Sequence, residues 1–382
     1  MKKFLAACAA LFVFATASAQ SLPAPTIAAR SWLLLDANSG QILGSHSPDM
    51  RIEPASLTKI MTAYMTFAAI RDKRLSLDKQ VNVSVAAWKV DGDSSKMFIE
   101  PNTQVSIEAL LYGLIVQSGN DAAVALAEAI AGTEQSFAEL MNREAQRMGL
   151  KNTRFANAHG LPHPDNYSTA RDLATLATNL INDFPELYKI YSTRSYTYNK
   201  ITQQNRNRLL WIDPTVDGMK TGHTAAAGYC LIATAKRPNG NHGPRRLVSV
   251  VLGTESDAMR AQESQKLLNW GFLNFDTYKV YSKGQPVLEP TVWKGSLNKV
   301  KLGFNRDVYV TLPRGTQLKL KPVVERTDPL IAPLARNTRV GTLKLMAGDK
   351  VVNTLPLLAL EQVNEATIIG RTFDSLRLMF QR

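Results

Sequence analysis

The hydrophobic pattern of this chain changes near residue 275, and this change constrains the fold more than any other feature. Between about residues 30 and 275, long helical patterns alternate with short strand patterns, whereas residues from about 280 to 360 show only short alternating runs between turn signals. Apolar positions repeat every 3.6 residues on a helix and every two on a strand. The pattern predicts an α/β (α+β) domain followed by a smaller all-β domain, and 382 residues suffice for two cores.

Within the first region, apolar residues at helical spacing predict two helices, each with one core-facing stripe. The stripe positions are Leu57, Ile60, Met61, Tyr64, Met65 and Ala68 in one helix, and Ile107, Leu110, Leu111, Leu114 and Ile115 in the other. The apolar runs Tyr229–Ala235 and Leu247–Leu252, with Pro and Gly between them, predict two strands, and Asp257–Phe275 returns to helix. In the second region, Gly348-Asp349 separates two alternating runs as a hairpin turn would.

The first residues have the pattern of a secretory leader. Lys2 and Lys3 precede an apolar run, Phe4–Thr16, and the small residues Ala17-Ser18-Ala19 follow it. We expect cleavage after Ala19, because this order of segments is typical of a signal peptide. The run is too short to span a bilayer as a helix.

The leader contains one of the two cysteines, so the mature chain keeps only Cys230 and can form no internal disulfide. Cys230 falls inside an apolar strand and is predicted to be an inert buried thiol. Without the leader, 43 Lys and Arg residues oppose 32 Asp and Glu residues, a formal charge of +11. From Asp276 onward, 17 basic residues oppose 9 acidic ones, so +8 of that charge lies in the last 107 residues.

The C-terminal end is amphipathic. Phe373, Leu376, Met379 and Phe380 share one face of a predicted helix, and most of the charged residues lie elsewhere. Such a helix either docks on its own domain or anchors the protein to a membrane surface, and the pattern alone favours neither.

Three short motifs carry residues suited to catalysis: Ser56-Leu57-Thr58-Lys59, Ser118-Gly119-Asn120 and Lys220-Thr221-Gly222. Each motif alone is weak, since Ser-x-x-Lys also occurs as a helix cap followed by a solvated lysine. Here the first motif opens a strongly apolar helix, so the serine and lysine share a face that continues into buried positions.

A serine hydroxyl is a weak nucleophile until a base removes its proton, and a lysine acts as that base only if its pKa falls toward neutrality. Burial would lower the pKa of Lys59, and we expect Lys220 to supply a nearby positive charge that lowers it further. We also expect one hydroxyl and two amino groups to lie within hydrogen-bonding reach of each other. Ser118-Gly119-Asn120 is expected in a short loop between two helices, and its other interpretation is plain helix capping.

The three motifs, 62 and then 102 residues apart, resemble the signature motifs of the penicillin-binding protein and serine β-lactamase superfamily. The chain resembles more closely the low-molecular-mass D-alanyl-D-alanine carboxypeptidases (peptidase S11-like) of Gram-negative envelopes. The features that carry this resemblance are the sequence KTGH, the stretch Asn205-Arg206-Asn207 and the β-rich C-terminal segment with its amphipathic tail. The resemblance covers essentially the whole mature chain. It implies a signal peptide (1–19), a serine β-lactamase/transpeptidase-like catalytic domain (20–275), a β-rich domain (276–363) and an amphipathic membrane-anchoring tail (364–382).

The resemblance also implies a role for each motif residue. Ser56 would attack the carbonyl between two terminal D-alanines of a peptidoglycan pentapeptide, and Lys59 would be its base. Ser118 and Lys220 would protonate the leaving group, and Asn120 would orient the substrate.

The remaining implied roles concern substrate binding. The backbone N–H groups of Ser56 and His223 would hold the oxyanion, while Thr221 and Arg260 would hold the terminal carboxylate. Gly222 would let the substrate backbone approach, and Arg206 is included as a substrate-binding residue. For Arg260, a structural ion pair is the alternative interpretation.

Other polar residues are assigned no catalytic part. No Glu stands in a recognisable deacylation motif, so Lys59 is expected to serve both half-reactions. Asp172 is expected to be the N-cap of the following helix. His159 and His163 lack a third ligand, so neither a metal site nor a cofactor is expected.

The sequence therefore predicts a periplasmic serine-type D-Ala-D-Ala carboxypeptidase, attached to the outer face of the inner membrane and covalently inhibited by β-lactams. Its expected partners are the pentapeptide and an anionic membrane surface, and no nucleic acid, because no groove-reading module is present. A β-lactamase or a D,D-endopeptidase on the same scaffold is the alternative within this chemistry. A non-catalytic wall-binding protein is the alternative from another class, although Ser56, Lys59 and Lys220 are all present.

Overall fold

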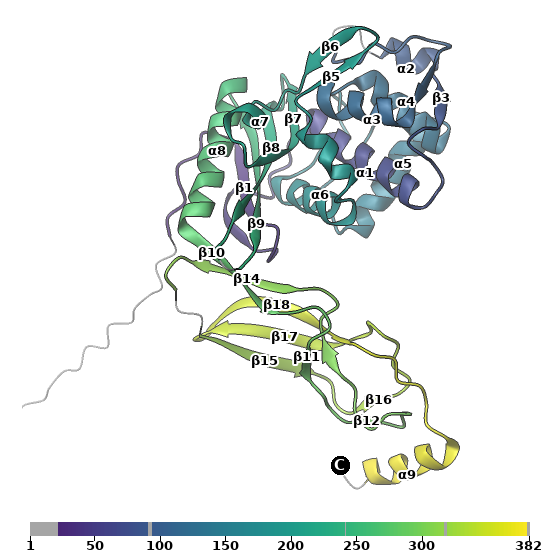
Figure 1. Ribbon diagram of the computed structural model, residues 1–382, viewed down its shortest axis with the longest axis vertical. Coiled ribbons are helices and arrows are strands. Elements are labelled where there is room, and N and C mark those ends of the chain that lie inside the picture. Colours follow the sequence, from purple (N-terminus) through teal and green to yellow (C-terminus); the bar gives the residue numbers. More distant parts are fainter. Residues whose placement is uncertain (1–21, 91–93, 241, 317–318, 380–382) are drawn as a thin grey trace, which may run out of the picture.

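The computed structural model describes residues 22–90, 94–240, 242–316 and 319–379. It contains two domains joined end to end, with a short helix at the far end of the second (Figure 1). The leader predicted at residues 1–19 lies outside the described residues. Within the described residues, no helix is both long and apolar enough to cross a membrane.

The first domain is built around a five-stranded antiparallel sheet in the order β2-β1-β9-β8-β7. These strands are β1 (Ser31–Asp36), β2 (Ile42–His46), β7 (Val216–Thr224), β8 (Gly228–Pro238) and β9 (Pro244–Thr254). β8 and β9 contain the two apolar runs, and the predicted pair of strands is confirmed. Both central strands are almost wholly buried, because helices cover both faces of the sheet.

One face of the sheet packs against α8 (Asp257–Asn274), through a core that includes Leu34, Leu231 and Leu267. The other face packs against a larger helical cluster (Figure 1). Its helices are α1 (Lys59–Arg71), α2 (Val85–Lys89), α3 (Ile107–Tyr112), α4 (Asn120–Ala131), α5 (Glu134–Arg147) and α6 (Ala170–Asp183). The smaller elements of this domain are β3 (Gln80–Asn82), β4 (Gln104–Ser106), β5 (Ser195–Tyr198), β6 (Ile201–Gln204) and α7 (Leu209–Ile212).

The helix α1 differs from its sequence-based description. One core-facing stripe was expected, but Thr62, Ala63 and Phe67 on its other faces are buried too, and Ala68 of the stripe is only half-buried. The small Ala and Thr side chains let neighbouring helices pack around the whole circumference. A helix that is buried on all sides has no strong amphipathic pattern. The predicted single apolar face therefore included fewer α1 residues than the structure buries.

The second domain is all-β, as predicted. It contains a five-stranded sheet in the order β11-β13-β18-β17-β15 and two smaller pairs, β10–β14 and β12–β16. The strands are β10 (Phe275–Tyr281), β11 (Pro286–Leu288), β12 (Val292–Trp293), β13 (Leu302–Gly303), β14 (Val308–Pro313), β15 (Leu320–Arg326), β16 (Leu330–Ile331), β17 (Arg339–Ala347) and β18 (Lys350–Ala359). The hairpin predicted at Gly348-Asp349 joins β17 to β18, and a separate apolar core lies beneath it.

A buried polar network joins the two domains. Arg245 Nε lies 2.7 Å from Asp36 Oδ2, and the same carboxylate oxygen accepts a hydrogen bond from Thr277 Oγ1 at 2.6 Å. Gln41 and Thr311 exchange two hydrogen bonds across the same junction. These contacts fix the start of the β domain against the ends of β1 and β9 in the sheet of the first domain.

The helix α9 (Ile368–Met379) follows the β domain and has no buried residue. Asp374 accepts a hydrogen bond from the Lys294 backbone N–H at 2.6 Å, so one side of the helix faces the domain. Ile368, Ile369, Phe373, Leu376 and Met379 are exposed. The interpretation in which the apolar face docks on its own domain is therefore wrong. Phe380, the fourth residue of the predicted apolar face, lies outside the described residues.

Candidate active site

The start of α1 brings the expected nucleophile and base together. Residues Ala55–Thr58 form a 3-10 turn that continues directly into α1 at Lys59. Lys59 Nζ lies 3.0 Å from Ser56 Oγ. A three-residue spacing gives this contact because a 3-10 turn places residues i and i+3 on the same side.

Lys59 makes two further hydrogen bonds, to Asn120 Oδ1 at 2.6 Å and to the carbonyl oxygen of His159 at 2.7 Å. Both of these oxygens only accept hydrogen bonds, so they require N–H groups of Lys59. The remaining direction of the amino group faces Ser56. When Lys59 is neutral, its lone pair therefore points at the Ser56 hydroxyl, which is the geometry of a general base.

Burial and, after it, the positive charge of Arg206 lower the pKa of Lys59 to about 7, while Asp121 and Glu134 oppose this shift. Arg206 supplies the positive charge that was expected from Lys220, and Lys220 and Lys59 also disfavour each other's charged form. Lys220 is itself buried, and burial, followed by the charges of Lys59, Arg206 and Arg260, holds its pKa well below the ordinary value. A lysine in that environment is a proton acceptor more than a fixed cation.

The expected cluster of one hydroxyl and two amino groups is only partly formed. Lys220 Nζ donates to the carbonyl oxygen of Thr221 at 3.1 Å. Ser118 Oγ is buried and has no hydrogen-bond partner within the described part of the chain. Ser56 and Lys59 thus form the hydrogen-bonded pair, and Lys220 is not bonded to either of them.

The loop Ser118–Asn120 has an unusual backbone. A π-helical turn, Gly113–Gln117, follows α3, and Ser118 then adopts φ 65°, in the left-handed region. A non-glycine residue in that region is uncommon and is often found at a functional site. The capping interpretation of Asn120 is wrong, because Gly119 occupies the cap position and the Asn120 side chain binds Lys59.

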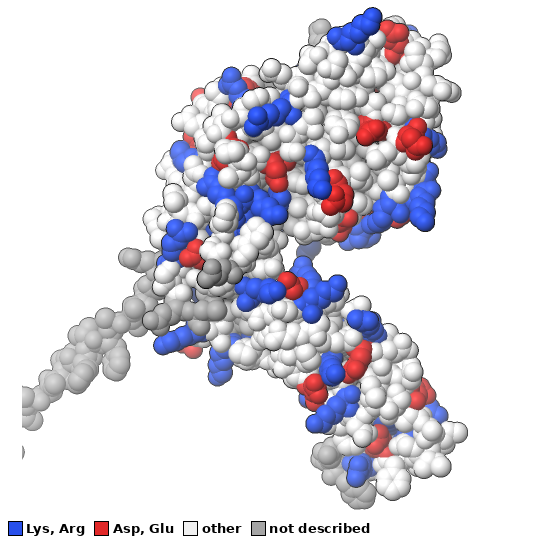
Figure 2. Space-filling view, in the orientation of Figure 1, with Lys and Arg blue, Asp and Glu red and all other residues white. Residues whose placement is uncertain are grey.

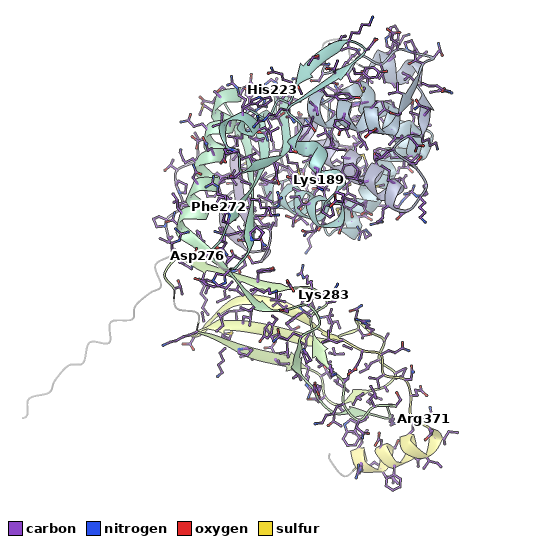
Figure 3. The ribbon with its side chains drawn as sticks, in the orientation of Figure 1. Lys189, His223, Phe272, Asp276, Lys283 and Arg371 are labelled. Carbon is purple, nitrogen blue, oxygen red and sulfur yellow. The ribbon has the colours of Figure 1, made fainter. Side chains whose placement is uncertain are left out.

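Lys220, Thr221, Gly222 and His223 lie on β7, an edge strand of the sheet. A Cβ at Gly222 would lie 3.1 Å from the carbonyl oxygen of Pro54, so glycine allows β7 to approach the turn that carries Ser56. The His223 ring stacks on Tyr229 with centroids 4.1 Å apart. His223 lies near the end of the sheet farthest from the β domain (Figure 3).

A cleft of roughly 1070 Å³ lies over this site. Its lining includes the sequence-predicted residues Ser56, Ser118, Asn120, Arg206, Thr221, Gly222, His223 and Arg260. Lys59 and Lys220 are buried beside it, with 1% and 3% of their surface exposed. The sequence analysis missed the apolar lining residues Leu161, Pro162, Trp211 and Ile212, which carry no motif.

The ion pair considered for Arg260 is present, and the same side chain lines the cleft. Its guanidinium pairs with the carboxylate of Asp257 and donates to the carbonyl oxygen of Gly222 at 3.2 Å. It also lines the cleft beside Thr221. The ion pair therefore holds a guanidinium group at the wall of the cleft, where a carboxylate would be attracted to it.

The structure also shows the contacts of the polar residues that were assigned no catalytic part. Asp172 is not the helix N-cap; Thr169 is, and Asp172 accepts hydrogen bonds from the Asn152 backbone N–H and the Thr153 hydroxyl. His159 lies beside Glu134, with Nε2 and Oε1 3.2 Å apart. In the described residues, no group of three or more His, Cys, Asp or Glu side chains is arranged to hold a metal ion. Cys230 is buried, and burial raises the pKa of its thiol to about 11.

Known proteins match both domains. Residues 16–256 match the Peptidase_S11 family, described as D-alanyl-D-alanine carboxypeptidase, and residues 275–365 match the penicillin-binding protein 5 C-terminal domain. The D-alanyl-D-alanine carboxypeptidase DacC of Escherichia coli (strain K12) is 42% identical, over 100% of this chain and 96% of its own.

Solved structures agree with these matches. Penicillin-binding protein 5 from Haemophilus influenzae has a TM-score of 0.82 at 45% identity, covering 90% of this chain and 100% of its own. Penicillin-Binding Protein D2 from Listeria monocytogenes, solved in the ampicillin-bound form, has a TM-score of 0.59 at 30% identity, covering 66% of this chain and 100% of its own. The resemblance and the fold class predicted from the sequence are both confirmed. The chain belongs to the D-alanyl-D-alanine carboxypeptidase family, Peptidase S11.

Proposed function

We propose that the protein is a serine-type D,D-carboxypeptidase that removes the terminal D-alanine from peptidoglycan pentapeptides through an acyl-enzyme on Ser56. The observation that carries the proposal is the 3.0 Å contact between Lys59 Nζ and Ser56 Oγ, in a site where burial lowers the pKa of Lys59 to about 7. The names of the relatives support the substrate class.

In the acylation step, Lys59 takes the hydroxyl proton as Ser56 Oγ forms a bond to the carbonyl carbon between the two D-alanines. The tetrahedral oxyanion would be held by the backbone N–H groups of Ser56 and His223, both residues of the cleft wall. The C–N bond then breaks, and the departing amine of D-alanine takes a proton. Ser118 Oγ, buried and unbonded at the cleft, would pass to that amine the proton that Lys59 took from Ser56, which leaves Lys59 neutral again.

The terminal carboxylate would bind Arg260 and the Thr221 hydroxyl, which line the same wall of the cleft. Binding this group next to a buried guanidinium would favour substrates that end in a free carboxylate. Arg206, exposed at the cleft, would add a second positive charge on the substrate's path.

Deacylation would use the same base. A water molecule attacks the ester of Ser56 while Lys59 accepts its proton, and the truncated peptide leaves with the Ser56 hydroxyl restored. A β-lactam would acylate Ser56 in the same way, since its strained amide carbonyl takes the place of the peptide bond. The Listeria relative solved in its ampicillin-bound form supports β-lactam binding by this chain.

We further propose that the protein works in the periplasm and attaches to the outer face of the inner membrane through α9. The exposed apolar face of α9 and the predicted leader support this location. Charge supports it less, because basic side chains of the β domain lie among acidic ones on the face shown in Figure 2. Arg371 on α9 lies at the opposite end of the molecule from His223 (Figure 3), so an anchored enzyme would hold its cleft away from the lipid.

The decisive experiment is mass spectrometry of the products that purified protein forms from a monomeric pentapeptide and from a cross-linked dimer, beside a hydrolysis assay with a chromogenic cephalosporin. Release of one D-alanine from the pentapeptide, with little cleavage of the other two substrates, would support the proposal. Predominant cleavage of the cross-link would make the protein an endopeptidase, and rapid turnover of the cephalosporin would make it a β-lactamase. No turnover of any substrate would support a wall-binding protein.

A further inference from the structure

A short segment, Ala158–His159, supplies one of the acceptors of Lys59 and is held in place by Glu134. Glu134 is the first residue of α5, and its Oε1 accepts a hydrogen bond from the Ala158 backbone N–H at 2.9 Å. The carbonyl oxygen of Ala158 accepts from Thr62 Oγ1 at 2.6 Å, which ties the same segment to α1. The carbonyl oxygen of His159 then accepts from Lys59 Nζ at 2.7 Å.

The His159 side chain strengthens this link. Its Nδ1 accepts a hydrogen bond from the Leu161 backbone N–H at 3.1 Å, which assigns the ring proton to Nε2. Nε2 lies 3.2 Å from Glu134 Oε1 and therefore donates to it. Burial and the charge of Lys59 lower the pKa of His159 to about 3, so the ring stays neutral at working pH. Burial raises the pKa of Glu134, while the Ala158 N–H and the charge of Lys59 favour its ionised form.

Five charged or titratable groups surround the Lys59 amino group. Two are basic, Arg206 at the cleft and Lys220 on β7, and their charges disfavour the ammonium form of Lys59. Two are acidic, Asp121 on α4 and Glu134 on α5, and their charges favour it. The fifth, His159, accepts a hydrogen bond from Lys59 through its backbone carbonyl. Asp121 is committed to the backbone N–H groups of Met97 and Phe98, each 2.9 Å away. Glu134 is the acidic group in this set that also holds an acceptor of Lys59.

We propose that Glu134 is a positioning residue: it holds the carbonyl that accepts from Lys59, and its negative charge sets the lowest pH at which Lys59 acts as a base. The proposal rests on the function proposed above, because it assumes that Lys59 is that base. A neighbouring negative charge stabilises the ammonium form, so Glu134 opposes the effects of burial and of Arg206. Without it, Lys59 would lose its proton at a lower pH.

The test is the pH dependence of kcat/KM for D-alanine release from a monomeric pentapeptide, measured from about pH 5 to about pH 9. Glu134→Gln keeps an oxygen acceptor for the Ala158 N–H and removes the charge. We expect its acid limb to move to lower pH by roughly half to one unit, with the plateau largely kept. Glu134→Asp keeps the charge and should leave the limb near its wild-type position.

Glu139→Gln is the matched control. Glu139 lies exposed on the same helix, and the substitution makes the same change in net charge without touching the Ala158–His159 segment. Glu134→Ala is a second neutral variant that also removes the acceptor. Glu134→Ala should shift the acid limb of kcat/KM in the same direction. It should also lower the plateau, because the Ala158–His159 segment loses its hydrogen bond to Glu134. This variant also allows the test if Glu134→Gln fails to fold.

An acid limb that stays in place in both neutral variants, with wild-type protein active, would overturn the role of Glu134 and leave the proposed function intact. The same holds if the plateau falls without any movement of the limb, since that result describes a purely structural contact. Wild-type protein that releases no D-alanine at any pH would instead defeat the proposed function. A shift in the Gln and Ala variants that is absent from the Asp and Glu139 variants would support the proposal.

Discussion

Asn120 Oδ1 and Lys59 Nζ lie 2.6 Å apart, although 61 residues separate them in the chain. The contact joins the first turn of α4 to the first turn of α1. It orients Lys59 as well as binding it, because an amide oxygen can only accept and therefore takes an N–H of Lys59, which leaves the lone pair of the neutral amine to face Ser56. Replacing Asn120 would therefore first change the orientation of the Lys59 amino group, and only secondarily the shape of the cleft.

Arg206→Gln should move the acid limb of kcat/KM to higher pH, the opposite direction from Glu134→Gln. The Arg206 charge lowers the pKa of Lys59, so removing it lets Lys59 keep its proton to a higher pH. A shift of roughly half to one unit would reduce kcat/KM near neutral pH about 3- to 10-fold. Arg208→Gln, another exposed arginine of the cleft wall, is the control. An unmoved limb would show that Arg206 does not act on the base.

Ser56→Ala should abolish D-alanine release and covalent labelling by fluorescent penicillin together. Both reactions require the oxygen that lies beside Lys59, and loss of a catalytic nucleophile costs at least about 1000-fold. Ser192→Ala removes an exposed hydroxyl elsewhere and should leave both signals unchanged. Labelling that persists in the Ser56 variant would move the nucleophile to another residue.

The motifs predicted much of the cleft because each places its residues by local geometry. The three-residue spacing of Ser56 and Lys59 gives a contact across one turn, and the order of the motifs gave the family. The β domain was predictable for the same reason, since alternation and the turn at Gly348-Asp349 act over a few residues.

The rest of the site depends on distant contacts that leave no local pattern. Glu134 and Lys59 lie on different helices, and nothing near Glu134 in the sequence indicates that it supports an acceptor of the base. The left-handed backbone of Ser118 follows a π-helical turn that ordinary helical spacing does not reveal. The effect of the Arg206 charge on Lys59 depends on how the fold places and buries the two side chains, which the spacing of the motifs does not provide.

Gly160→Ala should destabilise the protein and slow acylation. A Cβ at Gly160 would lie 1.8 Å from the carbonyl oxygen of Ala55, in the turn that carries Ser56, and the backbone has φ 89°. We expect a loss of about 3 kcal/mol or more in the free energy of unfolding, measured by urea denaturation. Gly132→Ala, at φ 79° with no atom within 4 Å of the new Cβ, should cost only about 1–2 kcal/mol. Equal losses in the two variants would contradict the steric argument.

Asp36→Ala should destabilise the junction between the domains. The Arg245 side chain is 2% exposed and pairs with Asp36, so removing the carboxylate leaves a buried guanidinium without its counter-ion. Breaking such a pair costs about 3–5 kcal/mol, which thermal unfolding would detect. Glu186→Ala breaks an exposed pair with Lys189 and should cost less than about 1 kcal/mol. A similar small loss for Asp36→Ala would mean that the remaining hydrogen bonds of Arg245 compensate.

Removing Arg371–Arg382 should shift the protein from the membrane fraction to the soluble fraction with unchanged turnover of a soluble pentapeptide. A finer test replaces Ile369 and Phe373 with Glu, because these side chains are 78% and 66% exposed and each would gain roughly 1.5–3 kcal/mol on entering an apolar phase. Val351→Glu places a charge at an exposed apolar site of the β domain, outside α9, and should leave the distribution unchanged.

Flotation of the purified proteins with vesicles of anionic and of neutral lipid separates the two contributions to this attachment. Binding to both vesicle types that is lost in the Glu variant would mean that the apolar face of α9 carries the attachment. Binding to anionic vesicles alone, with strong salt dependence, would assign it to basic residues such as Arg371 and Arg377. If the Glu variant and the truncated protein float as the wild type does, α9 is not an anchor, and its exposed apolar face must serve another partner.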